Sequence, residues 1–271
     1  MMTKGILERV PPFALLSLQL SSSVAFLWLC VLLTRTRVQL NAQTWRAAST
    51  GTLEPGMAYA LGVPGLALTT ASSASIIAAT EPAIIVLLAW WLLRERPAGR
   101  VVAAITVAVI GVLLVSAADF KHLHAGDALG NALVLMGTVF AALYVVRSSR
   151  LVAQVQPLLL AALQQSVGML IALGLLLAAV ALKLEMPPTQ ISLETVLYAM
   201  LSGIVQYALA FWSYLQGMRG MSTEAAALFL VLIPVFGVGG AVVFLHETIS
   251  GWQAAGVVLV VGAVLSIQRS S

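Results

Sequence analysis

Long runs of apolar residues, separated by short polar stretches, dominate the sequence. A helix that crosses a bilayer needs about 20 apolar residues. Windows of that length predict nine membrane spans, at Pro11–Leu33, Gly51–Thr70, Ser72–Leu93, Val101–Ala118, Asp127–Arg147, Pro157–Lys183, Leu193–Gln216, Thr223–Leu245 and Trp252–Ile267. The linkers between them are short, so we expect an all-α polytopic membrane protein without large extramembrane domains.

One pattern occurs twice along the chain. Pro82 is followed thirteen residues later by Glu95, and Pro234 is followed thirteen residues later by Glu247. The stretch between is apolar in both copies, and a glycine-bearing apolar helix follows each glutamate. An internal repeat of this length indicates a duplicated bundle of helices, a construction found in many transporters.

A second match lies upstream, where Pro12–Gln19 and Pro157–Gln164 pair proline with glutamine at equal spacing. The helix Asp127–Arg147 precedes the second copy, whereas only ten residues precede the matching apolar run in the first. The sequence therefore predicts two repeats, residues 1–119 with four helices and residues 120–271 with five. Two explanations stay open, a start that lies upstream of this sequence or a nine-helix form whose N-terminus is outside.

Composition supports the membrane assignment. Hydrophobic residues make up 61% of the chain and charged residues 9%, whereas soluble domains carry about 25% charged residues. The net charge of +4 comes without a basic cluster interleaved with aromatics, so we expect no nucleic-acid partner. Cys30 is the single cysteine, which excludes an intrachain disulfide and a thiolate-rich metal site, and we expect no cofactor.

The distribution of Lys and Arg predicts the orientation. Cytoplasmic loops carry an excess of these residues. With the C-terminus inside, ten of the fourteen fall in inner loops, at Arg35, Arg37, Arg46, Arg94, Arg96, Arg100, Arg147, Arg150, Arg219 and Arg269. Glu95 then lies on the inner side and Glu247 on the outer side. Equivalent loops on opposite faces indicate that the two repeats are inverted relative to each other.

Three segments resemble the EamA-type branch of the drug/metabolite transporter superfamily. They are TEPAIIVLLAWWLLRERPAG, GDALGNALVLMGTVFAALYVVRSSR and LIPVFGVGGAVVFLHETISGWQAAGVVLVVGAVLSIQ. The resemblance implies two inverted five-helix repeats around a central cavity, cytoplasmic termini, and movement of small metabolites, often outward. The chain departs from that pattern by lacking the first of its ten helices.

Glu81 is the strongest candidate for a residue of the substrate or proton pathway. It lies in the middle of an apolar span, where a carboxylate costs about 2.5–3.5 kcal/mol on insertion scales. Such a group faces protein or water, and we interpret it as a cavity residue that binds an amine-bearing substrate or takes up a proton. The alternative is a protonated acid that is hydrogen-bonded locally beside Pro82.

Prolines and polar side chains within the spans complete the candidate set. Pro82, Pro234 and Pro64 each remove a backbone hydrogen bond and are candidate hinges, with static packing as the alternative. Buried amides and hydroxyls bind a substrate or join helices, and joining helices is the commoner role. These candidates are Gln19, Gln164, Gln165, Gln206, Tyr207 and Tyr214.

The sequence thus predicts a secondary transporter in the inner or plasma membrane, with a cytoplasmic C-terminus. We expect it to export a small polar or amphipathic metabolite, such as an amino acid or amine, with H⁺ coupling through Glu81 as the candidate energy source. Enzyme motifs such as H-E-x-x-H and G-x-S-x-G are absent, so we expect no enzyme. The alternative is a non-transporting membrane scaffold that acts through helix–helix partners, and a monomer and a homodimer both fit.

Overall fold

The structure is a computed structural model. It describes residues 6–7, 10–38, 41–69, 74, 77–78, 80–94, 96–116, 128–185, 191–230, 232 and 251–268. Within these ranges the chain forms helices joined by turns, and no strand occurs. The hinge candidate Pro234 and the repeated glutamates Glu95 and Glu247 lie outside them.

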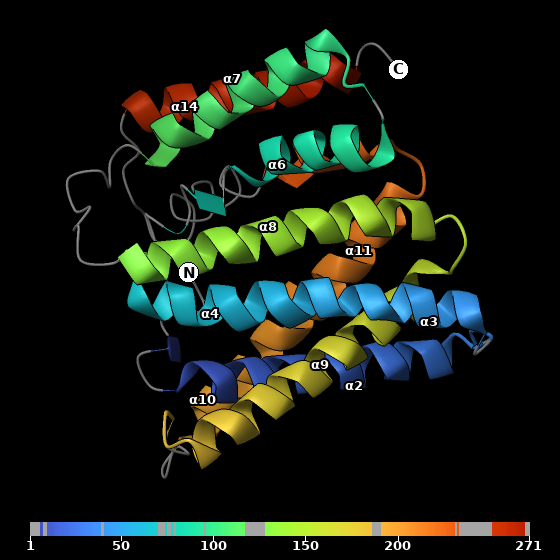
Figure 1. Cartoon of the computed structure of the whole chain (residues 1–271), viewed down its shortest axis with the longest axis vertical. Coiled ribbons are helices and arrows are strands. Elements are labelled where there is room, and N and C mark those ends of the chain that lie inside the picture. The colour runs from blue at the N-terminus through green and yellow to red at the C-terminus, as the bar shows by residue number, and fades with distance from the viewer. Residues whose placement is uncertain are drawn as a thin grey trace.

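The helices are stacked as a bundle in which most axes run roughly along one direction (Figure 1). In chain order the elements are α2 (Pro12–Leu33), α3 (Ala42–Ser49), η1 (Thr50–Thr52), η2 (Leu53–Met57), α4 (Ala58–Leu68), α6 (Glu81–Leu88), η3 (Ala89–Leu93), α7 (Gly99–Ser116), α8 (Ala128–Leu151), α9 (Pro157–Ala181), α10 (Leu193–Gly203), η6 (Ile204–Leu209), α11 (Ala210–Met218), α12 (Thr223–Leu230) and α14 (Gly251–Gln268).

Four of these helical stretches are long and apolar enough to cross a membrane. They are Pro12–Leu33, Ala128–Leu151, Pro157–Ala181 and Leu193–Met218. Shorter apolar helices, Glu81–Leu93, Gly99–Gly111 and Ala254–Ala263, accompany them. The expectation of an all-helical, multi-pass membrane protein is confirmed, and the count of nine spans stays a prediction.

The second predicted span differs from the structure at its start. A helical run begins at Ala42 and reaches Leu68 through α3, η1, η2 and α4, whereas the apolar window begins at Gly51. Asn41 explains the earlier start, because its side chain accepts from the Thr44 backbone N–H at 2.9 Å while the Thr44 hydroxyl accepts from the Asn41 N–H at 2.8 Å. This reciprocal cap begins a helix whose first turns are polar, and hydropathy alone does not detect it.

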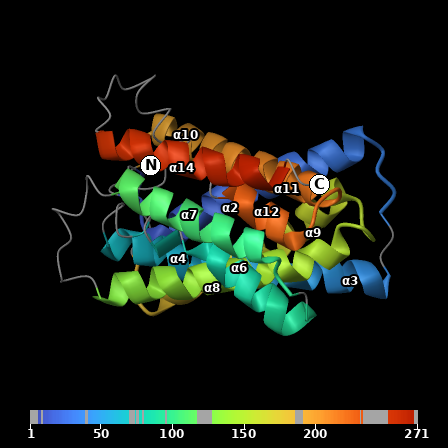
Figure 2. The same ribbon diagram turned by 90° about the horizontal axis from the view of Figure 1, so that it is seen from above.

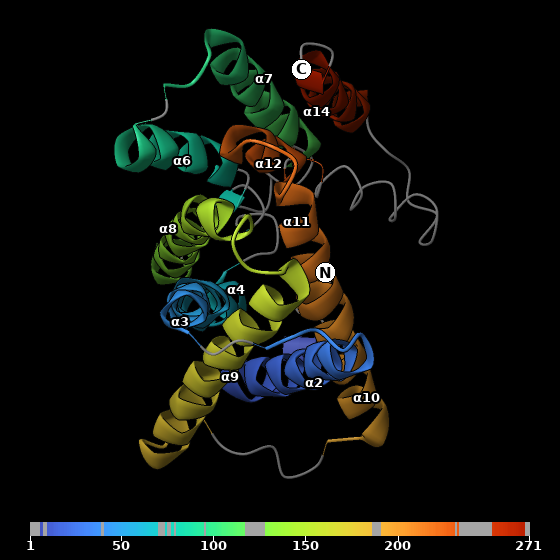
Figure 3. The same ribbon diagram turned by 90° about the vertical axis from the view of Figure 1, so that its right-hand side faces the viewer.

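Helices α2 and α9 pack against each other in opposite directions. At one end the Phe13 backbone N–H donates to the Glu185 carboxylate at 3.0 Å, which joins the start of α2 to the end of α9. At the other end Thr34 and Gln156 line one pocket, so the end of α2 meets the start of α9. Figure 3 shows this crossing pair, with α10 beside α2.

Two other pairs rely on close backbone approach. Helix α7 packs along α14, and the two lie together on one side of the bundle (Figure 2). A side chain on Gly111 of α7 would collide with the backbone of Gly256 in α14. Helix α4 packs along α8, where Gly137 would collide in the same way with the backbone of Ala58. Small residues at such contacts let membrane helices approach closely.

Basic residues gather at one end of the bundle. The Gln43 side chain donates to the Gln154 side chain at 2.9 Å, and this contact joins the start of α3 to the turn after α8. The pocket of Thr34 and Gln156, which Gln216 also lines, belongs to the same end. Six arginines occupy these termini and turns, Arg35, Arg37, Arg46, Arg147, Arg150 and Arg219, and all are exposed.

Candidate functional site

Gln164 joins three helical stretches in the interior. Its side chain is completely buried, and its amide N–H donates to the hydroxyls of Thr50 at 2.6 Å and Ser148 at 3.2 Å. Its carbonyl accepts from the Tyr144 hydroxyl at 2.9 Å. Such a fully bonded amide holds helices together, which is the commoner of its two predicted roles.

Gln19 makes the corresponding joint on the other side of the α2–α9 pair. It is completely buried, donates to the Ser202 hydroxyl at 2.8 Å and accepts from the Tyr207 hydroxyl at 3.4 Å. Tyr207 is itself a predicted pathway residue, and the structure brings these two candidates together.

Each glutamine faces a glycine on the helix that it joins. A side chain on Gly51 would collide with the backbone of Gln164, and one on Gly203 would collide with the backbone of Gln19. The glycine follows the hydrogen-bonded hydroxyl residue in both cases, Thr50 before Gly51 and Ser202 before Gly203. The two joints therefore share one arrangement, a buried amide against a hydroxyl–glycine pair.

Gln165 is also completely buried, and its carbonyl accepts from the Ser23 hydroxyl at 3.4 Å. Its side-chain N–H has no hydrogen-bond partner in the part of the chain that the structure describes. A fully buried amide with a free donor is unusual and leaves capacity for a further bond.

The helical run that begins at Ala42 is broken at Glu54. The backbone there is extended, with φ −145° and ψ 129°, between helical neighbours. Gly168 of α9 makes room for the Pro55 ring that follows, since a side chain at this glycine would overlap it. In membranes such breaks occur where the backbone lies against protein or lines a cavity, and transporters use them at binding sites.

Aromatic rings surround this break. The Tyr59 and Tyr207 rings lie with centroids 4.8 Å apart, and Tyr59 meets Phe211 edge-on at 6.2 Å. Tyr144 lies 5.6 Å from Phe211 on the other side. The Tyr59 hydroxyl is within hydrogen-bonding reach of the Glu54 carboxyl, so the carboxyl lies against the ring cluster.

Glu81 belongs to the same cluster. Its carboxyl interacts electrostatically with that of Glu54 and with the Tyr214 hydroxyl. Glu54, Glu81 and Tyr214 are each only partly buried as whole residues, although the Tyr214 hydroxyl itself is buried. Among the described residues the Tyr214 hydroxyl has no hydrogen-bond partner.

The two described hinge candidates occupy different positions in their helices. Pro82 lies in the first turn of α6, where the missing N–H costs no helical hydrogen bond, and it is buried. Pro64 lies inside α4, where it removes one. Gln206 lies in the π-helical turn η6 beside Tyr207, and such turns are frequent at functional sites.

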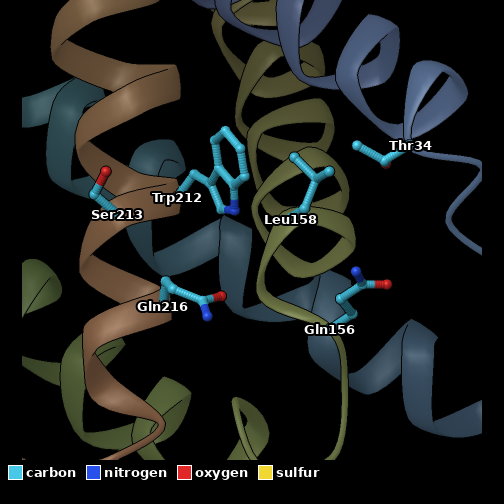
Figure 4. Close-up of a pocket in the computed structure, with 6 residues that line it drawn as sticks. All are labelled: Thr34, Gln156, Leu158, Trp212, Ser213 and Gln216. Atoms are coloured by element: carbon cyan, nitrogen blue, oxygen red, sulfur yellow. The ribbon is translucent and has the colours of Figure 1, made fainter.

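A pocket of about 350 Å³ opens at the arginine-rich end of the bundle (Figure 4). Trp212, Ser213 and Gln216 of α11 line one side, and Gln156 and Leu158 line the other together with Thr34. The Trp212 ring lies between α11 and α9, facing Leu158 (Figure 4). None of these lining residues is charged.

Sequence reasoning missed Glu54 and the aromatic rings beside it. A signal was present, because Glu54-Pro55 and Glu81-Pro82 are the two Glu-Pro dipeptides of the chain, both within apolar spans. Glu54 lay near the start of its predicted span, where a carboxylate is ordinary. Only the longer helix that begins at Ala42 places it well inside the run.

The arrangement is that of a polytopic helical membrane protein with polar residues in its interior. Comparison of the sequence with known families identifies the family. The EamA-like transporter family matches residues 1–117 and 128–268, and the chain belongs to this family. The predicted resemblance is confirmed, and with it a membrane protein of the drug/metabolite transporter type.

A solved structure titled "Crystal structure of protein" has the same fold. It is 22% identical in sequence, with a TM-score of 0.78 over 99% of this chain and 93% of that chain. No curated protein matches the sequence significantly.

Proposed function

We propose that the protein is a secondary transporter that exports a small polar or amphipathic metabolite, such as an amino acid or amine. The observation that carries the proposal is the interior cluster of Glu54, Glu81 and Tyr214 beside a broken membrane helix. Transport proceeds by alternating access around this cluster, and the pocket at Trp212 forms its vestibule at one end.

The same proposal includes two inverted repeats, residues 1–119 with four spans and residues 120–271 with five. The equivalent joints at Gln19 and Gln164, made by two antiparallel helices, support it. The arginine-rich end is then cytoplasmic, together with the C-terminus, in the inner or plasma membrane.

Cysteine labelling tests the orientation. In a Cys30→Ser background, single cysteines replace Arg94, Lys183 and Thr248. We expect an impermeant maleimide added outside intact cells to label the cysteines at 183 and 248 and to spare the one at 94. Labelling of the cysteines at 94 and 248 from the same side contradicts the inverted repeats.

Flux in proteoliposomes tests transport itself. Vesicles loaded with a defined mixture of amino acids and amines lose at least one solute faster than protein-free vesicles, as measured by mass spectrometry. If no solute leaves faster, the transporter proposal is wrong and the scaffold alternative gains support.

Proton coupling is a separate part of the proposal and rests on Glu81. With a pH-sensitive dye inside the vesicles, flux of the transported solute changes the internal pH, and Glu81→Gln removes this change. Undiminished, still pH-coupled flux in that variant rejects the role of Glu81. Glu194→Gln at the exposed first turn of α10 is the matched control.

A further inference from the structure

The carboxyls of Glu54 and Glu81 lie in one interior region, where the described part of the chain supplies no counter-charge. The two acids are near enough to interact electrostatically, which is unfavourable when both are charged, and the other groups that interact with them in the described ranges are tyrosines. Every Arg and Lys within those ranges is exposed at a helix end or turn. Two carboxylates so placed are stabilised when a cation lies between them.

The aromatic rings point to the same chemistry. Tyr59, Tyr207 and Phe211 form a contiguous cluster, and the Tyr59 hydroxyl reaches the Glu54 carboxyl. Aromatic faces attract organic cations, and groups of such rings bind quaternary ammonium ligands. The free Tyr214 hydroxyl adds an acceptor beside the two carboxyls.

The backbone beside these groups is irregular. At Glu54 the extended backbone departs from the helical hydrogen-bonding pattern, and this occurs next to the carboxyl. Half-helix ends and unwound carbonyls hold cations at the centre of other transporters. Carboxyls and aromatic rings therefore lie beside a break in a membrane helix, and both kinds of group favour positive charge.

We propose that Glu54 and Glu81, with the rings of Tyr59, Tyr207 and Phe211, form a binding site for a small organic cation of the ammonium class. This inference rests on the proposed transport function and names the substrate class of the same site. Glu54 then determines specificity together with Glu81.

Binding of choline to the purified full-length protein tests this site, with 3,3-dimethylbutan-1-ol as the probe of equal shape and no charge. We expect choline to raise the unfolding temperature in a saturable manner and the neutral alcohol to leave it unchanged. Equal shifts with both compounds, or no shift with choline, overturn the proposal, and this comparison needs no variant.

Two variants locate the binding. Glu54→Gln and Tyr59→Leu each weaken choline binding about tenfold or more, since each removes a charge or an aromatic face from the site. Glu194→Gln leaves it unchanged, and the unfolding temperature without ligand shows whether each variant is folded. Undiminished binding in a folded Glu54→Gln protein overturns the assignment of Glu54.

Flux measurements separate this inference from the transport proposal. Choline that binds but does not cross proteoliposomes leaves the cation site in place and counts against transport. Movement of neutral or anionic solutes without choline binding supports transport and overturns the cation site.

Discussion

The two helical stretches that flank the α2–α9 pair have the same packing residues but differ in sequence one helical turn further on. Gly51 and Gly203 each lie against a buried glutamine, and a hydroxyl residue precedes each glycine. Three residues after each glycine the sequences differ, with Glu54 in one and Gln206 in the other.

This difference indicates that the residues that pack the helices together can be the same while the polar residues near them differ. The glycine–glutamine joint occurs twice because both contacts bring two helices close together. If the two predicted repeats are aligned on these joints and on the Pro–Glu pattern, Gln206 corresponds to Glu54 and Ile233 to Glu81. The two acids of the site then belong to the first predicted repeat alone.

Alanine at either packing glycine disrupts a helix contact, and we expect the largest loss of stability from these two substitutions. Gly51→Ala and Gly203→Ala each place a Cβ on the backbone of a facing glutamine, and such overpacking costs about 1–3 kcal/mol. We expect a lower unfolding temperature and yield for both, measured in detergent. Gly174→Ala, with open space at its Cβ, is the control, and an equal loss there would contradict the role of the joints.

A double variant that moves the carboxyl from position 54 to position 206 tests the difference between the two stretches. If Glu54 and Gln206 line the same site, Gln206→Glu in a Glu54→Gln protein returns most of the roughly tenfold loss in choline binding, because the charge is restored nearby. The measurement is the choline-induced shift in unfolding temperature. Continued loss in a folded double variant places Gln206 away from the site.

The two glutamines differ in a smaller way. Gln164 bonds to Thr50, Ser148 and Tyr144, whereas Gln19 bonds to Ser202 and weakly to Tyr207. Hydrogen bonds between membrane helices contribute about 0.6 kcal/mol on average, so Gln164→Leu destabilises more than Gln19→Leu. Chemical denaturation of both variants measures the difference, and the reverse order would be inconsistent with these bonds.

The sequence predicted the helical, multi-pass fold and the family, because apolar runs and their spacing determine both. It also placed Gln19, Gln164, Tyr207, Tyr214 and Glu81 within spans, and the structure brings Tyr214 beside Glu81. It missed Glu54, since the early start of that helix depends on the side-chain cap at Asn41 rather than on hydropathy. Ring contacts such as Tyr59 with Tyr207 join distant segments, and no local pattern predicts them.

The hydrogen bond from the Phe13 N–H to Glu185 gives the α2–α9 pair unequal ends. A hydrogen bond joins the two helices where α2 begins, while at their other ends Thr34 and Gln156 line a pocket. We therefore expect relative movement of the two helices to be smallest at Glu185 and largest at the pocket end, beside the exposed arginines. Glu185→Gln keeps the hydrogen-bond acceptor and Glu185→Leu removes it, so a comparison of the two variants tests whether this bond restrains the α2–α9 pair.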